Sequence, residues 1–139
     1  MSVPEPPPAS GEQRQLLLRQ ISSGMAQMQK EAFGKGPTST KSYLFDDMLL
    51  IVMRDGLTVA EETMLSFGQA DLVRNFRQQF ENEMTSRIVD MIEGLARRKV
   101  LTYQSQIMFN PDVVVEMFVL DRADEGFTAA EVREESEHA

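Results

Sequence analysis

Apolar residues recur at three- and four-residue intervals in two long stretches of this chain, and each stretch predicts an amphipathic helix. In the first, over residues 12–33, the apolar positions are Leu17, Ile21, Met25 and Met28. Gly34 suits the position just after a helix, because glycine takes a positive φ without steric cost. Ser22-Ser23-Gly24 has low helix propensity, so we expect a weak point or kink in the middle of this helix.

The second stretch, over residues 69–98, predicts the longest helix of the chain. Its apolar positions are Val73, Phe76, Phe80, Met84, Ile88, Met91, Ile92 and Leu95. We expect Asp71 to cap the N-terminus, since a carboxylate accepts hydrogen bonds from the free backbone N–H groups there. A shorter helix is predicted from Thr58 to about Phe67, because Thr58 and Glu61 have the spacing of a capping box.

Four further segments predict β-strands that come in two pairs. In each pair a polar, alternating strand precedes one that is almost wholly apolar, and the ranges are 38–45 with 48–54 and 100–109 with 113–120. Asp46-Asp47 and Asn110-Pro111-Asp112 predict the turns within the pairs. Strands that are apolar on both faces are typical of the centre of a sheet covered on both sides.

These elements predict an α+β fold in which two α-β-β units form a four-stranded antiparallel sheet packed by helices. The folded domain is expected over residues 12–121. Residues 1–11, rich in proline, and residues 122–139, rich in acidic side chains, are expected to be disordered tails.

The amino-acid composition excludes several classes of functional site. The sequence has no cysteine, and its single histidine is His138, so disulfides, thiolate metal sites and histidine-based triads are excluded or very unfavourable. No apolar run approaches the length of a membrane span and no signal peptide is visible, so we expect a cytoplasmic protein without direct membrane insertion. The net charge of −8 argues against binding to nucleic acid.

The corner Gly34-Lys35-Gly36-Pro37 is the leading candidate for a binding site, because two glycines beside a lysine can form an anion-binding nest of backbone N–H groups. Arg74 and Arg77, three residues apart on the long helix, would complete a site for a carboxylate, bicarbonate or phosphate, with Lys41 or Arg54. Ordinary structural roles are favoured over such a site, and Arg74, Arg77 and Glu81 lie largely off the apolar stripe of the long helix. The corner would be a helix cap and turn, and the arginines a solvated face paired with Asp71 or Glu81.

Glu116 interrupts an otherwise apolar strand. We expect it to face solvent or to pair with an arginine of a helix or of a second subunit, with a functional acid as the alternative. Asp46, Asp47 and Asp112 fall in predicted turns, and turn chemistry is favoured there over a weak cation site. We expect no catalytic residue, no metal site and no cofactor.

Several of these segments, taken in order, resemble the MpsC-like family, long catalogued as a domain of unknown function. They are Gly34-Lys35-Gly36-Pro37-Thr38, Leu57-Thr58-Val59-Ala60-Glu61, Val73-Arg74 with Arg77, Arg98-Lys99-Val100, and Asp112 followed by Glu116-Met117-Phe118-Val119-Leu120. The resemblance covers about residues 12–121 and rests on order and spacing, since no single motif is specific. Ala96-Arg97 departs from the family pattern, in which a glycine is expected close to the arginine.

The family is named for a sodium-translocating, membrane-potential-generating system. The resemblance implies a small soluble bacterial protein associated with a membrane system for ion-coupled or inorganic-carbon uptake, and it implies no catalytic residues. We therefore predict a non-enzymatic accessory or regulatory module. It would form a homodimer, work with a membrane transporter subunit, and reach the periphery of the inner membrane only through that partner.

The alternative hypothesis is a sensor of a small anion, bicarbonate or phosphate. Its binding residues would be Gly34, Lys35, Gly36, Arg74 and Arg77. An RNA-binding domain is a third and weaker hypothesis, because the sequence offers no basic face interleaved with aromatic residues.

Overall fold

The computed structural model describes residues 11–122, which form three helices and one four-stranded sheet. The elements in chain order are α1 (Gly11–Phe33), β1 (Ser39–Phe45), β2 (Met48–Arg54), α2 (Val59–Ser66), α3 (Ala70–Ala96), β3 (Val100–Met108) and β4 (Val113–Leu120). The tails predicted at the two ends lie almost wholly outside the described residues. The helix predicted from residue 12 begins at Gly11 and runs to Phe33 as one element.

All neighbouring strands are antiparallel, and the sheet order is β1-β2-β4-β3. The two apolar strands are therefore central and the two polar strands form the edges. Each polar strand makes a hairpin with the apolar strand that follows it, and the hairpins join where β2 pairs with β4, with Leu50 opposite Met117. The predicted α+β fold with two α-β-β units is confirmed.

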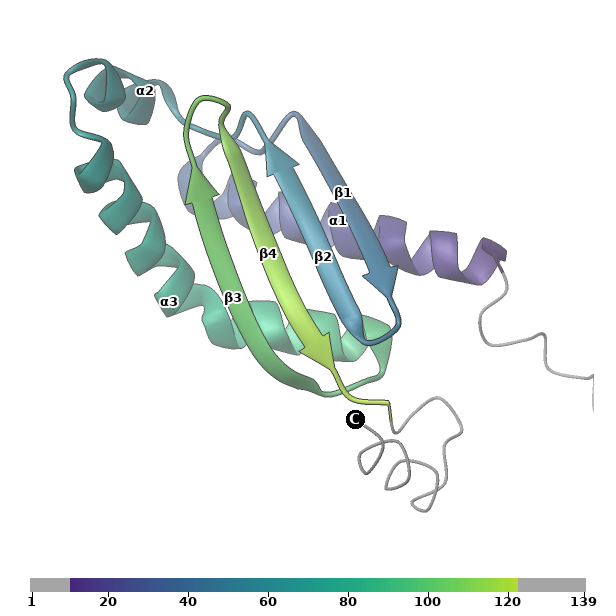
Figure 1. The fold of residues 1–139 in the computed structure, drawn as a ribbon. Helices are drawn as coiled ribbons and strands as arrows, with labels where there is room; N and C mark the ends of the chain where they lie inside the picture. Colours follow the sequence, from purple (N-terminus) through teal and green to yellow (C-terminus); the bar gives the residue numbers. More distant parts are fainter. Residues whose placement is uncertain (1–10, 123–139) are drawn as a thin grey trace, which may run out of the picture.

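Both long helices, α1 and α3, lie on the same face of the sheet (Figure 1). Apolar side chains from the two helices and from alternate positions of β2 and β4 fill the space between. The most completely buried are Ile21, Met25, Leu49, Ile51, Ile88, Ile92, Phe118 and Leu120. This core explains why the helical apolar spacing and the central strands were both legible in the sequence.

The opposite face of the sheet carries apolar residues too, and no described element covers it (Figure 1). We call it the open sheet face, and its apolar members are Tyr43, Phe45, Met48, Leu50, Val52, Val115, Met117 and Val119. Phe45 is 59% exposed and Tyr43 is 40% exposed. The prediction that both faces of the apolar strands are covered is thus wrong within residues 11–122, because both long helices pack on one side.

The helix ends show where local sequence rules hold. Thr58 and Glu61 form the predicted capping box at the start of α2. Asp71 does not cap α3, because the helix begins at Ala70 and Gln69 occupies the cap position, with no side-chain cap bond. At the other end Arg97 takes the left-handed conformation, with φ 56° and ψ 39°. This is the place where the family pattern led us to expect a glycine.

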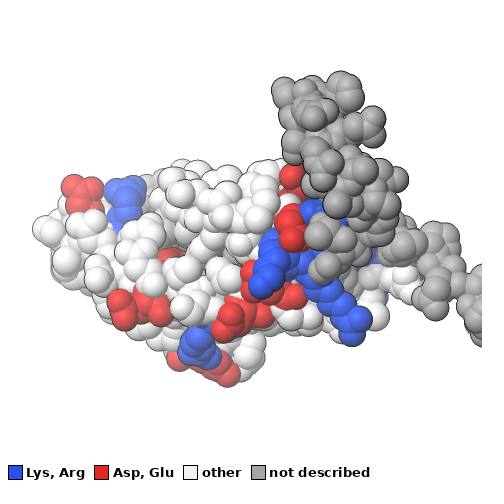
Figure 2. All heavy atoms as spheres, turned by 90° about the horizontal axis from the view of Figure 1, so that it is seen from below, with Lys and Arg blue, Asp and Glu red and all other residues white. Residues whose placement is uncertain are grey.

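Charged side chains of both signs are mixed at the end of the molecule where β1 turns into β2 and α3 passes into β3 (Figure 2). Arg122 pairs with Asp46 there, and the side-chain Nε of Arg98 donates to the backbone oxygen of Asp121. Asp112 lies at the opposite end of the sheet, beside Arg54 and Asp55. The three turn aspartates therefore do not form one cluster.

Candidate functional site

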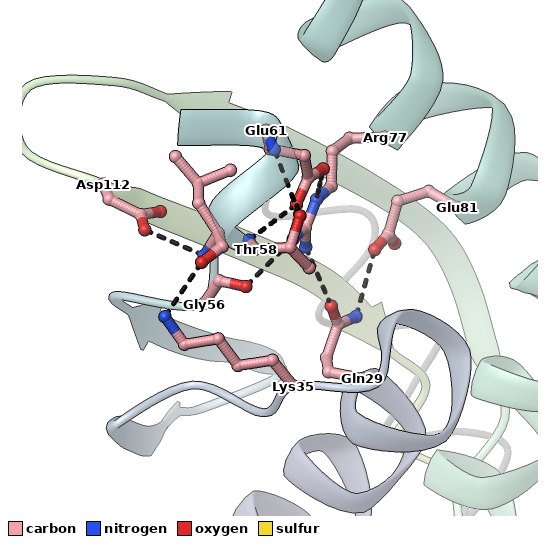
Figure 3. Close-up of polar contacts among 9 residues, drawn as sticks. Gln29, Lys35, Gly56, Thr58, Glu61, Arg77, Glu81 and Asp112 are labelled. Carbon is pink, nitrogen blue, oxygen red and sulfur yellow. Dashed lines mark hydrogen bonds and ion pairs between the residues drawn. The ribbon is translucent and has the colours of Figure 1, made fainter. Parts of the chain in front are cut away.

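Polar side chains with little solvent exposure lie between the helices and the sheet and form one continuous set of hydrogen bonds. We call this set the buried polar network. Its members are Gln29, Glu61, Arg77, Glu81, Tyr103 and Glu116. They come from α1, α2, α3, β3 and β4, so the network connects all three helices to the sheet. Figure 3 shows the part of the network around Arg77.

Arg77 is the centre of this network and is only 3% exposed. Its Nε and Nη2 donate to the two carboxylate oxygens of Glu61 at 2.6 and 2.5 Å, and Nη2 also donates to the backbone oxygen of Gly56 at 2.9 Å. Nη1 donates to Oε1 of Gln29 at 3.4 Å. The guanidinium also lies 3.7 Å from the ring centroid of Phe33, a cation–π contact.

Glu61 serves two elements at once. Its carboxylate closes the capping box by accepting the backbone N–H of Thr58 at 2.9 Å, and it pairs with Arg77 of α3. Burial by itself raises the pKa of Glu61, but the hydrogen bonds from Arg77 and Thr58 outweigh burial, so its pKa lies below the usual value. The charged form of Glu61 therefore stabilises both the start of α2 and the contact between α2 and α3.

From Arg77 the network continues through Gln29 to a pair of carboxyl groups. The amide nitrogen of Gln29 donates to Glu81 at 3.3 Å. The hydroxyl of Tyr103 lies 2.7 Å from Oε2 of Glu81 and 2.8 Å from Oε1 of Glu116. Burial, and then the charge of Glu81, raise the pKa of Glu116 well above its usual value. Burial and the two nearby carboxyl groups also raise the pKa of the Tyr103 hydroxyl.

The predicted anion site is divided in the structure. Gly34 follows α1 with φ 79°, as expected for a helix end, and Nζ of Lys35 donates to the backbone oxygen of Leu57 at 2.9 Å. Arg77 lies on the other side of the segment Gly56–Thr58 and is engaged by Glu61 (Figure 3). Arg74 points elsewhere: it is exposed, pairs with Asp71 at 3.2 Å and lies over the ring of Phe109.

An anion that used Arg77 would have to displace the Glu61 carboxylate, and Arg74 does not join the corner around Lys35 and Gly36. Anion binding by these residues stays a prediction, and calorimetric titration with bicarbonate and phosphate tests it. Within residues 11–122 no group of three His, Cys, Asp or Glu side chains is placed to hold a metal ion.

Sequence reasoning missed most of the buried polar network. Arg77 and Glu81 were assigned to the solvated side of the long helix, yet both lie in the buried row with Val73, Met84 and Ile88. Their spacing of four and eight residues from Val73 was the available signal. The expectation that Glu116 faces solvent or an arginine is also wrong, because it is fully buried and bonds to Tyr103. Its position in an apolar strand was the only hint.

Asp112 is a further acidic side chain with a defined role at this end of the sheet. Its Oδ2 accepts the backbone N–H of Leu57 at 3.0 Å, so the β3–β4 turn holds the residue that precedes α2. Burial raises the pKa of Asp112 against the opposing effect of that hydrogen bond. Lys35 and Asp112 both bond to the backbone of Leu57 and thus form a second set of contacts beside Arg77 (Figure 3).

The fold and the network define a small α+β protein with a one-sided helical layer, a charged interior and an open sheet face. In a comparison with family models, residues 13–122 match the model described as Na+-translocating membrane potential-generating system (MpsC). The chain therefore belongs to the MpsC family, as its motifs suggested. Neither the curated proteins nor the solved structures gave a match. No helix of the described chain is long and apolar enough to cross a membrane.

Proposed function

We propose that this protein is a non-enzymatic accessory or regulatory module of a membrane system of the kind that the family description names. It acts as a homodimer and reaches the membrane through a subunit of that system. Family membership supports the association with a sodium-linked membrane system. The observation that carries the accessory role is the open sheet face, because a large uncovered apolar surface marks a site of protein–protein contact.

A second copy of the chain fits this surface. Two sheets pack face to face about 10 Å apart when their apolar residues interdigitate, and a twofold axis makes one patch complementary to itself. Met48 and Met117 supply flexible side chains that adapt to such a contact. Lys41 and Arg54 flank the patch at one end of the strands, and the Asp46–Asp47 turn lies at the other end. An antiparallel dimer would therefore bring basic and acidic ends together.

The dimer is tested by sedimentation analysis of purified wild-type protein and of Met117→Glu. We expect a dimer for the wild type and a monomer for Met117→Glu, since a charge at the centre of an apolar contact is costly. Val59→Glu is the matched control, because Val59 is 77% exposed on α2, away from the sheet face, and this variant should stay dimeric. A monomeric wild type at micromolar concentration would contradict the homodimer.

The accessory role is tested by affinity purification of the tagged protein from gently solubilised membranes, followed by mass spectrometry. Recovery of an integral membrane transport subunit by the wild type, and by Val59→Glu, would support the proposal. Recovery of the protein alone, as a homo-oligomer, would contradict the accessory role and leave the small-anion sensor as the hypothesis to pursue. The two tests are independent, so the dimer and the membrane partner can fail separately.

A further inference from the structure

The two contacts of the Tyr103 hydroxyl need one proton more than the tyrosine itself carries. A tyrosine hydroxyl has a single proton to donate, yet its oxygen lies at hydrogen-bond distance from two carboxyl oxygens, 2.7 Å from Glu81 and 2.8 Å from Glu116. If both carboxyl groups were ionised, one of the two contacts would be a repulsion between oxygens. One carboxyl group must therefore carry a proton and donate it to the tyrosine oxygen.

The charges around the pair lead to the same conclusion. Glu81 is 3% exposed and Glu116 is 0% exposed. Arg77, the nearest cation along the network, is already neutralised by Glu61. The neighbours on the other elements are uncharged: Gln29 of α1 donates an amide hydrogen bond to Glu81, and Ile51 of β2 and Ser105 of β3 lie opposite Glu116. Two ionised carboxylates in this setting would have no compensating charge, which is strongly unfavourable in a buried site.

We propose that Glu81, Tyr103 and Glu116 form a buried proton-binding site that holds one exchangeable proton between the two carboxyl groups at neutral pH. Glu116 is the residue that carries it at rest, because it is fully buried in a strand between apolar residues, while Glu81 accepts hydrogen bonds from both Gln29 and Tyr103. The hydroxyl of Ser105 on β3, whose residue lies opposite Glu116 in the sheet, is a further polar neighbour of that carboxyl group.

The proton has a path to solvent. Glu81, Tyr103 and Ser105 line a surface pocket of about 340 Å³ between α3 and β3. Transfer needs two coupled steps: the O–H bond of Glu116 breaks as one forms on Tyr103, and the original O–H bond of Tyr103 breaks as one forms on Glu81. The tyrosine ends as a neutral hydroxyl. The proton then sits on Glu81, a residue that lines the pocket.

The direct test is infrared spectroscopy of the full chain labelled with ¹³C-glutamate. We expect the carbonyl stretch of a protonated glutamic acid at neutral pH, which disappears as the pH is raised. The isotope separates this signal from Asp112, another carboxyl group within residues 11–122 whose pKa is raised by burial. Absence of a protonated glutamic acid at pH 7 would overturn the proposal, and this measurement needs no variant.

Glu116→Gln should remove the signal, and Glu83→Gln, at an exposed position on α3, should keep it. The pH dependence of stability supplies an independent readout. Because the pKa of Glu116 is higher in the folded than in the unfolded state, the contribution of Glu116 to stability is fully present below the unfolded pKa. This contribution is lost as the pH rises through the folded pKa. Between these two pKa values, the folding equilibrium constant of the wild type should fall by up to about tenfold per pH unit. Glu116→Gln should lose most of this slope and keep the part that Asp112 contributes, and a full wild-type slope retained in Glu116→Gln would overturn the assignment.

Sodium distinguishes a proton from a metal cation. The oxygen–oxygen distances of 2.7 and 2.8 Å are those of hydrogen bonds. The protonated signal should therefore be the same in sodium chloride and in choline chloride at equal ionic strength. Loss of the signal in sodium alone would show that a metal cation fills the site, and the proton assignment would be wrong.

Discussion

Arg77 and Glu61 form a bidentate ion pair across the contact between α2 and α3, with both side chains removed from solvent. The geometry matters for stability because a buried charge is tolerated only with a full set of partners. Arg77 has four hydrogen bonds and an aromatic face, and Glu61 also holds the first turn of α2. Breaking this pair should cost far more than breaking a surface ion pair.

We predict that Glu61→Ala destabilises the protein by about 3–5 kcal/mol, the usual cost of leaving a buried partner charge uncompensated. Urea denaturation measures the change. Glu62→Ala is the matched control, because Glu62 is exposed in the same helical turn, and it should change stability by less than about 0.5 kcal/mol. A similar effect in both variants would show that helix propensity, rather than the ion pair, sets the cost.

Thr58→Ala separates the cap from the ion pair. It removes the hydroxyl that accepts the backbone N–H of Glu61 at 3.2 Å and leaves Arg77 paired. We expect a loss of about 1 kcal/mol, as is typical for an N-cap residue. Thermal unfolding of Thr58→Ala beside Glu61→Ala measures the two contributions. A loss as large as that of Glu61→Ala would mean that the capping box, and not Arg77, is the main partner of Glu61.

Glu61 also predicts how stability changes in acid. Because the pKa of Glu61 is lower in the folded state, its contribution is fully present above the unfolded value of about 4.5 and is lost as pH falls through the folded pKa. The stability difference between wild type and Glu61→Gln should therefore shrink as the pH is lowered below 4.5. Chemical denaturation at a series of pH values tests this, and a constant difference down to pH 2 would contradict the assigned pKa direction.

The sequence predicted the elements and the fold class because both follow from period and turn chemistry, which are local. It did not predict the buried charges, because Arg77 and Glu81 are polar by type and only the packing of α1 against α3 shows that they face inward. Glu116 is likewise polar by type, and only the packing of the sheet shows that it faces inward. Its partner Tyr103 is thirteen residues away, and the sheet register brings them to neighbouring strands.

The end of α3 has the left-handed residue that usually follows a helix, but the sequence did not show which residue adopts this conformation. The family pattern led us to expect a glycine near Ala96-Arg97, and the structure puts Arg97 in the left-handed conformation that glycine favours. We predict that Arg97→Gly stabilises the protein by about 1 kcal/mol, since a residue with a Cβ atom is less stable than glycine by about that much in the left-handed conformation. Thermal unfolding measures it. Arg97→Ala keeps a Cβ atom and should give no gain; an equal gain would show that loss of the arginine charge is responsible.

Gly24 of α1 packs against Met91 of α3 where the two helices are in contact. A Cβ atom at Gly24 would lie only 2.5 Å from the Met91 sulfur, so Met91 leaves no room for a larger residue. Replacing glycine with alanine inside a helix normally stabilises by about 1 kcal/mol. We predict that Gly24→Ala fails to show this gain and that Met91→Ala restores it in the double variant. Gly94→Ala is the control, because nothing lies within 4 Å of its added Cβ and the gain should appear in full. Urea denaturation of the four variants in a double-mutant cycle gives the coupling. A full gain in Gly24→Ala alone would mean that Met91 moves aside at no cost and that the helices are not held together at this point.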